Sequence, residues 1–211
     1  MSLQEKIIKS EKDLEEGIKF LSQHDPILSN VIDREKIVLT KRDAGFSALL
    51  KTIISQQLST LAAGKIWQRV VDNELNIQSN ILKVNAETLL SLGLSRQKCS
   101  YALALAQDKL DYSILGEMDS NTVIKRLTEI KGIGQWTAQI YCMFSLARGD
   151  IFPSGDLALQ EAIRGLFSLE KRPNIKEVDE ISKRWTPWKT IAAIVLWDFY
   201  RQQKKREGVL W

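Results

Sequence analysis

The stretch that decides how this chain is interpreted is residues 127–138, Leu-Thr-Glu-Ile-Lys-Gly-Ile-Gly-Gln-Trp-Thr-Ala. It joins two segments of helical periodicity through a tight turn in which Gly132 and Gly134 lie two residues apart. Glycine suits such a turn because it adopts positive φ and lets another backbone approach closely. Amides at the turn and at the start of the second helix have no intrahelical partner, so they can donate to a phosphate. Gly-x-Gly alone is equally compatible with an ordinary turn between two helices.

Helical periodicity runs through almost the whole chain. Asn85, Ser95 and Ser120 precede periodic segments and are predicted N-caps. Pro187 is predicted to stand in the first turn of the last long helix. Ile37–Thr40 alone has the pattern of a short extended piece. The predicted helices cover residues 3–22, 43–58, 60–73, 86–92, 96–110, 121–129, 135–147, 157–167 and a last stretch from 187.

These predicted helices define an all-α fold. We expect a single domain over residues 1–211, built of two packed helical lobes with the hairpin at 120–147. Ligand sites tend to lie in the cleft between two such lobes. We therefore expect the active site in a cleft between the lobes.

Composition limits the class of protein without identifying it. Hydrophobic residues make up 44% of the 211 residues, which is enough for a core. A net charge of +4 permits a polyanionic partner but does not require one. Cys99 and Cys142 have no metal-ligand spacing, which argues against a thiolate-bound zinc or iron–sulfur site. The sequence shows no membrane-spanning run and no signal peptide, so we expect a cytoplasmic protein that does not contact a membrane.

The Asp156 carboxylate follows the hairpin by about 20 residues. Residues 151–157 read Ile-Phe-Pro-Ser-Gly-Asp-Leu, so Asp156 stands where a Pro/Gly-rich loop meets a predicted helix. Taken alone, Asp156 reads as an N-cap. Capping and catalysis are compatible, because a cap fixes the side chain and the helix N-terminus favours its ionised form.

In this order and spacing, the hairpin and the carboxylate resemble the helix-hairpin-helix/Gly-Pro-Asp superfamily of DNA glycosylases. The match is not literal, since Pro153 and Gly155 flank Ser154 here. The resemblance implies that Asp156 is catalytic: a carboxylate stabilises oxocarbenium-like charge on the sugar and orients a water after the base has left the stack. It also implies that the hairpin holds the DNA backbone through Lys131, Gly132, Ile133, Gly134 and Thr137.

Trp136 narrows the expected chemistry. Family members that also cleave the strand carry a lysine at this position, and many carry a four-cysteine cluster that is absent here. We therefore predict a monofunctional glycosylase that uses water as its nucleophile. Gly-Ile-Gly-x-Trp-Thr-Ala is most similar to the bacterial 3-methyladenine DNA glycosylase II family, which implies alkylated purines as substrates. An indole face can stack on such a cationic base, which contributes roughly 0.5–2 kcal/mol.

Other segments resemble the same family. Gln56 and Gln57 match a loop beside the lesion, and Ser95 with Arg96 matches a helix start that faces the DNA. The resemblance makes Gln56 and Gln57 candidates for the base pocket together with Trp136, Tyr141 and Trp188. For Trp185 and Trp188, a role in the core remains an open alternative.

The resemblance also bears on ligands and partners. It implies double-stranded DNA with damaged bases as the partner, no required cofactor, and a Na⁺ or K⁺ ion held by main-chain carbonyls of Thr128, Ile130 and Ile133. We expect a monomer associated with the nucleoid. Longer members have an N-terminal α/β domain without a counterpart here, so any pocket wall it supplies is expected to be missing. Two alternatives stay open: a glycosylase for another damaged base, and a non-catalytic DNA-binding protein.

Overall fold

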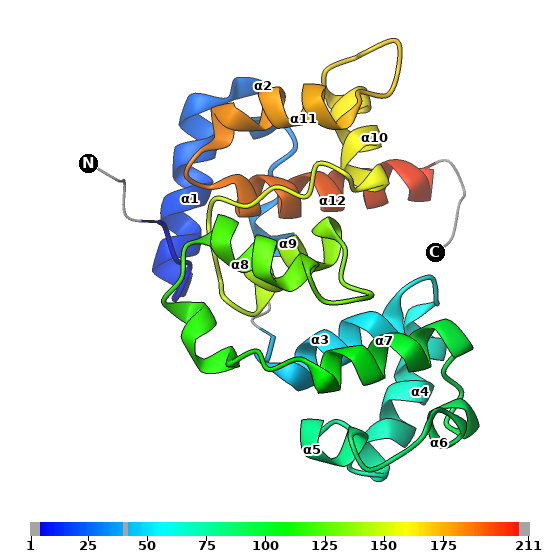
Figure 1. Cartoon of the computed structure of the whole chain (residues 1–211). Coiled ribbons are helices and arrows are strands. Elements are labelled where there is room, and N and C mark those ends of the chain that lie inside the picture. The colour runs from blue at the N-terminus through cyan, green and yellow to red at the C-terminus, as the bar shows by residue number, and fades with distance from the viewer. Residues whose placement is uncertain (1–4, 40–41, 207–211) are drawn as a thin grey trace. The chain divides into compact units, whose positions relative to one another are not determined.

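The computed structural model describes residues 5–39 and 42–206, and these residues form helices joined by short loops (Figure 1). Within the described ranges, the only β-type pairing is an isolated antiparallel bridge between Ile7 and Arg148. The all-α prediction is therefore confirmed. In this part of the chain, no helix is both long and apolar enough to span a membrane.

The chain divides into two compact units. The terminal unit contains the described residues up to 39 and those from 142 onward, and the central unit contains residues 42–141. The helices of the terminal unit are α1 (Glu11–His24), α2 (Pro26–Ser29), η1 (Arg34–Lys36), α10 (Leu157–Leu166), α11 (Ile175–Ser182), η3 (Lys183–Trp185) and α12 (Lys189–Arg206). Those of the central unit are α3 (Phe46–Ser55), α4 (Thr60–Asp72), α5 (Gln78–Ile81), α6 (Ala86–Ser91), α7 (Arg96–Gln107), η2 (Tyr112–Gly116) and α8 (Ser120–Thr128), and α9 (Gln135–Phe144) crosses the division.

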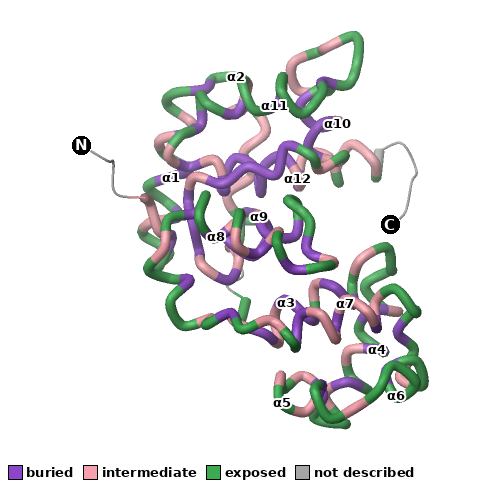
Figure 2. The backbone as a smooth tube through the Cα atoms, viewed as in Figure 1, coloured by how far each residue is buried: buried purple, intermediate pink, exposed green. Residues whose placement is uncertain are grey.

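The core of the terminal unit forms around α12. Residues 191–196 are all buried, as Figure 2 shows along the first part of this helix. Such an all-round apolar run is typical of a helix covered on every side. Gly17 lets α1 approach α12 closely, because a Cβ there would lie 2.3 Å from Ile191 Cδ1 and 2.7 Å from Trp188 Cε3. The buried face of α12 thus fixes the helices that surround it.

The core of the central unit forms between α3, α4 and α7. Leu49, Leu50, Ile53 and Ile54 of α3 are fully buried. Their spacing of three and four residues places them on one helical face. This face anchors the segments that flank α3 at both ends.

The predicted caps of α6 and α7 are present. Asn85 accepts a hydrogen bond from the Thr88 amide at 3.0 Å, and Ser95 accepts one from the Lys98 amide at 3.3 Å. Ser120 is not a cap, which corrects the prediction. Asp119 caps α8 instead, and Ser120 is the buried first residue of that helix. Both types cap well, so local sequence does not choose between neighbouring candidates.

Three other boundaries differ from the predictions. The first helix begins at Glu11 because Ser10 and Asp13 form a capping box, and residues 6–8 instead pair with residues 147–149. Ile37–Leu39 forms no strand, and Thr40 lies outside the described residues. Pro187 precedes α12 rather than opening it, because η3 and a turn lie between α11 and α12.

Candidate active site

The hairpin between α8 and α9 requires glycine at residue 132 for two reasons. Gly132 has φ +95°, a conformation that residues with a Cβ rarely adopt. A Cβ there would also lie 2.2 Å from Cγ of Tyr101 on α7. The turn is closed by hydrogen bonds from the Ile130 amide to the Leu127 carbonyl and from the Ile133 amide to the Ile130 carbonyl. The turn is therefore held against α7 at a fixed conformation.

The start of α9 is exposed and polar. Gly134 is exposed, a Cβ built on it would meet nothing within 4 Å, and its carbonyl accepts from the Ala138 amide at 3.0 Å. By the geometry of any α-helix, the first amides of α9 have no partner within the helix. Lys131 is exposed on the other side of the turn. The hairpin can therefore bring main-chain donors and a positive charge to an anion.

Gln56, in the loop after α3, forms hydrogen bonds to the hairpin. Its Nε2 donates to the Gly132 carbonyl at 3.2 Å and to Thr137 Oγ1 at 3.4 Å. Thr137 is buried. The sequence assigned Gln56 to the base pocket and Thr137 to the DNA backbone, but the structure brings these two side chains to each other. Both hold the turn in place from within the central unit.

The other residues of the expected DNA-facing segments are exposed. Gln57 adopts φ +56°, and Leu58 beside it is 40% exposed. Ser95 and Arg96 at the start of α7 are also exposed. Lys98 joins the two segments, because its ammonium donates to the Ile54 carbonyl at 2.7 Å.

Trp136 and Tyr141 differ although both lie on α9. Trp136 is 41% exposed, which leaves much of its indole accessible to a ligand. Tyr141 is buried, and its hydroxyl accepts a hydrogen bond from the Gly45 amide at 2.8 Å. That contact holds the start of α3. The structure therefore assigns Tyr141 to packing, which corrects its placement in the base pocket.

Asp156 is the N-cap of α10. Its Oδ1 accepts from the Leu159 amide at 3.0 Å and from Trp197 Nε1 at 3.2 Å. The side chain is half-buried. Two donors on one oxygen fix the carboxylate at the beginning of the helix, where the helix dipole favours negative charge.

The loop before Asp156 is fixed at several points. The Asp156 amide donates to the Pro153 carbonyl at 2.8 Å, and Gln160 Nε2 donates to the Ser154 carbonyl at 2.8 Å. The Ser154 hydroxyl donates to Asp179 of α11. Residues 151–154 are all buried. The backbone that carries the carboxylate is therefore held from α10 and α11.

Trp197 was not among the residues expected at the site. Its ring stacks on Phe144, with centroids 6.2 Å apart and an interplanar angle of 25°, while its N–H reaches Asp156. The only signal in the sequence was a tryptophan at the end of the apolar run 191–197. Periodicity cannot show that this side chain reaches a residue 41 positions earlier.

Trp185 and Trp188 both lie in the core of the terminal unit. Trp185 is fully buried, and its Nε1 donates to Asp25 Oδ2 at 2.8 Å. Trp188 is 2% exposed and packs against Gly17. The pocket assignment of Trp188 is therefore wrong, and the core alternative holds for both.

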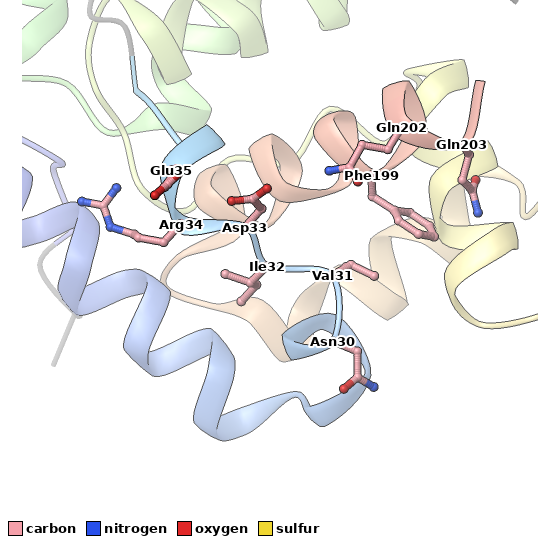
Figure 3. Close-up of a pocket in the computed structure, with 9 residues that line it drawn as sticks. All are labelled: Asn30, Val31, Ile32, Asp33, Arg34, Glu35, Phe199, Gln202 and Gln203. Atoms are coloured by element: carbon pink, nitrogen blue, oxygen red, sulfur yellow. The ribbon is translucent and has the colours of Figure 1, made fainter. Parts of the chain in front are cut away.

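Two hollows of the terminal unit are lined by none of the predicted site residues. One, of about 620 Å³, lies between the segment 30–35 and Phe199, Gln202 and Gln203 of α12 (Figure 3). Among the described residues, no cluster of His, Cys, Asp and Glu is arranged to hold a metal ion.

Main-chain oxygens at the hairpin have the chemistry that a monovalent cation needs. Thr128 is the last residue of α8, so its carbonyl is one of those that a helix leaves without an intrahelical donor. The Ile130 carbonyl accepts from the Ile133 amide at 3.0 Å and keeps a second lone pair. The residues present therefore fit a carbonyl-bound cation.

Comparison with known proteins identifies the family to which this sequence and fold are similar. A family model described as HhH-GPD superfamily base excision DNA repair protein matches residues 50–187. The alkylbase DNA glycosidase-like protein mag2 of Schizosaccharomyces pombe is 28% identical over 172 residues, which cover 77% of this chain and 81% of that protein. The putative DNA-3-methyladenine glycosylase YfjP of Bacillus subtilis is 31% identical over 166 residues, which cover 72% of this chain and 58% of that protein.

Solved structures show the same fold. A DNA-3-methyladenine glycosidase from Bacillus halodurans has a TM-score of 0.78 and 30% identity, with 96% of this chain and 95% of that chain covered. The Schizosaccharomyces pombe 3-methyladenine DNA glycosylase in complex with abasic DNA has a TM-score of 0.74 and 25% identity, with 93% of this chain and 100% of that chain covered.

Proposed function

Because the chain belongs to the HhH-GPD superfamily of base excision DNA repair proteins, we propose that it hydrolyses the N-glycosidic bond of alkylated purines in duplex DNA. The observation that carries the proposal is the Asp156 carboxylate, fixed at the start of α10 by the Leu159 amide and by Trp197. The substrate class, purines of the 3-methyladenine type, is supported by relatives named as 3-methyladenine glycosylases.

In this proposal, Asp156 acts on the sugar. Cleavage of the glycosidic bond develops oxocarbenium-like positive charge, which a fixed carboxylate stabilises electrostatically. Trp197 and Leu159 both donate to Oδ1, so the carboxylate is held in one orientation in which it can act on the sugar and on an attacking water. The base must leave the stack before it can react. An alkylated purine carries positive charge and leaves readily, so little acid catalysis is needed.

The hairpin and the start of α7 provide DNA contacts from the central unit. The amides at the start of α9 and the Lys131 side chain contact phosphates, and Ser95 with Arg96 contacts the backbone from the start of α7. A Na⁺ or K⁺ ion on the carbonyls of Thr128, Ile130 and Ile133 would supply a further positive charge for a phosphate. None of these contacts reads sequence, which suits a repair enzyme that meets lesions in any context.

Leu58 is a candidate for filling the space that an extruded base leaves. It is exposed in the same loop as Gln57, between α3 and α4. Apolar side chains that enter base steps stabilise unstacked DNA. The exposed indole of Trp136 is the candidate surface for the extruded cationic base.

We propose a hydrolytic enzyme without lyase activity. Trp136 stands where a strand-cleaving member carries its nucleophilic lysine, and Lys131 lies on the other side of the turn. Borohydride trapping on lesion-containing duplex should give no covalent adduct, and a trapped adduct would contradict this assignment. The protein is expected to act as a monomer, which light scattering of the free protein and its DNA complex would test.

The proposed function is tested with duplexes that each carry one lesion: an N-methylated purine, hypoxanthine, uracil or 8-oxoguanine. Chromatography of the free base should show release from the methylated substrate, and Asp156→Asn should abolish it. Release of a different base only would favour a glycosylase for that lesion. Tight, salt-dependent DNA binding without any release would favour a non-catalytic DNA-binding protein. Undiminished release by Asp156→Asn would refute the assigned role of Asp156.

A further inference from the structure

A cluster of cations lies on the same helix as Trp197. A hollow of about 530 Å³ in the terminal unit is lined by Lys36, Asp198, Arg201, Gln202 and Lys205. It adjoins the hollow of Figure 3, since Gln202 lines both. Three of the five lining side chains are cationic and one is a carboxylate. None of them belongs to the hairpin, the Asp156 loop or the other segments assigned to DNA.

The carboxylates near the cluster hold two of its cations in place. Asp198 is 6% exposed and accepts from Gln202 at 2.5 Å and from Arg201 at 3.3 Å. Asp33 pairs with Lys36 at 2.6 Å, and Asp33, more strongly than Asp198, raises the pKa of Lys36. Lys205 forms no ion pair with a carboxylate of the described chain. The lining side chains themselves carry three cations and one carboxylate, and Asp33 and Glu35 act on Lys36 from beside the hollow. Lys205, the cation without a carboxylate partner in the described chain, makes the hollow a candidate site for an anion.

The position of the cluster along α12 relates it to the proposed catalytic carboxylate. Arg201 and Lys205 follow Trp197 by four and eight residues, so they lie about 6 Å and 12 Å further along the helix. At 100° per residue they are turned by only about 40° and 80° from Trp197, which places all three on one side of α12. Trp197 contacts Asp156. Arg201 and Lys205 therefore lie on the side of α12 from which Trp197 contacts the proposed catalytic carboxylate.

We propose that Lys36, Arg201 and Lys205 form a phosphate-binding surface of the terminal unit for the DNA strand that carries the damaged base. The inference rests on the proposed function, because Asp156 must face the sugar of that strand. One DNA strand places a phosphate at every 3.4 Å of helix axis, so a span of 6–12 Å corresponds to a few consecutive phosphates. The surface would add phosphate contacts from the terminal unit to those of the hairpin in the central unit.

A purely structural role is the competing explanation. Cations in the last turns of a helix are stabilised by its dipole, and this needs no ligand. The two roles differ in their response to salt, because only residues that neutralise phosphates contribute to the release of counterions on binding. They also differ in their response to neutralised phosphates in the DNA.

The first test measures the affinity for a duplex with one tetrahydrofuran abasic analogue as a function of salt. Substituting Lys36, Arg201 and Lys205 together by alanine should lower the slope of log K against log[salt] by about 1 for each residue. Lys19→Ala is the matched control, since Lys19 is an exposed cation of α1 on the side opposite the buried Gly17. An unchanged slope in a folded triple variant, or an equal decrease in the control, would overturn the inference.

The second test replaces single phosphates beside the analogue by methylphosphonates. The wild type should lose affinity at two or three phosphates on one side of the lesion, and the triple variant should lose little at those positions. Equal losses in both proteins would show that the cations touch no phosphate. If thermal melting shows that the triple variant is unfolded, Lys205→Ala alone is measured, with an expected slope change of about 1.

Base release separates this inference from the proposed function. If Asp156→Asn lowers base release but the triple variant has an unchanged salt slope, only the phosphate surface is refuted. No release of any base by the wild type would refute the proposed function, and the salt slope would still decide whether the cluster contacts DNA.

Discussion

The hairpin of the central unit and the Asp156 loop of the terminal unit are built in opposite ways. The hairpin works through its main chain: Gly132 sets the turn, and the amides that follow are its donors. The Asp156 loop works through one side chain, which a distant indole and a cap hydrogen bond hold in place. In the proposed function, the hairpin binds DNA through main-chain groups and Asp156 carries the chemistry through its side chain, so substitutions should separate the two.

The largest effect on stability is expected at Gly132. In Gly132→Ala, the strain of a positive φ adds to the clash with Tyr101, which should destabilise the hairpin by about 2–4 kcal/mol and weaken DNA binding by at least tenfold. Gly134→Ala is the matched control for the free energy of unfolding, because a Cβ there meets no protein atom within 4 Å. Denaturant unfolding and DNA titrations measure both quantities. If the two variants have the same free energy of unfolding, the assigned difference between the glycines is contradicted.

A smaller effect is expected at Trp197. Trp197→Phe keeps an aromatic ring beside Phe144 but removes the N–H that donates to Asp156. A hydrogen bond to a charged group is worth about 1.5–3 kcal/mol, so base release under single-turnover conditions should slow by roughly tenfold or more. DNA affinity should be unchanged. Trp67→Phe in the central unit serves as the control, and weakened DNA binding by Trp197→Phe would contradict a role limited to the carboxylate.

Gln56 should have a milder effect, on binding alone. Gln56→Ala removes the hydrogen bonds to Gly132 and Thr137, which together contribute about 1 kcal/mol. The affinity for DNA should fall several-fold, while the rate of release at saturating enzyme stays the same. If Gln56 instead contacts the base, the rate at saturation will fall, and this outcome would restore the interpretation based on sequence.

One cysteine thiol lies in each unit, so thiol labelling can follow the unfolding of the two units separately. In the native protein, almost no labelling is expected. Burial raises the pKa of Cys142 in the terminal unit to about 12 and also raises that of Cys99 in the central unit. Both thiols should therefore resist a disulfide reagent at pH 8. Because the native state retains these protons, the free energy of unfolding should decrease as pH rises above about 9.

Labelling in increasing denaturant then compares the regions. In Gly132→Ala, Cys99 should become reactive at a lower denaturant concentration than Cys142. Rapid labelling of either thiol in the native wild type would contradict the burial of that side chain.

What the sequence predicted well is local. The hairpin lies within twelve consecutive residues, and the caps Asn85 and Ser95 act on amides three residues away. The helical periodicity that gave the all-α fold is equally local. Asp156 was identified through its spacing along the chain from the hairpin. In the structure it caps α10, which agrees with the interpretation of this residue as an N-cap.

What the sequence did not predict depends on long-range contacts. Trp197 reaches Asp156, and Gln56 reaches a carbonyl 76 positions later. Trp188 and Tyr141 looked like pocket aromatics but are covered by packing. Residue type and spacing cannot distinguish an aromatic ring that faces a ligand from one that faces Gly17. These assignments required the folded chain.

The most direct test of the account measures affinity and the single-turnover rate of base release on one methylated duplex for Asp156→Asn and Gly132→Ala. The account predicts that Asp156→Asn binds this DNA as the wild type does but releases at least a hundredfold less base. It predicts that Gly132→Ala binds weakly but releases base at the normal rate once the DNA is saturated. If both variants lose affinity and rate together, or if Asp156→Asn releases base normally, the division between a binding hairpin and a catalytic carboxylate is contradicted.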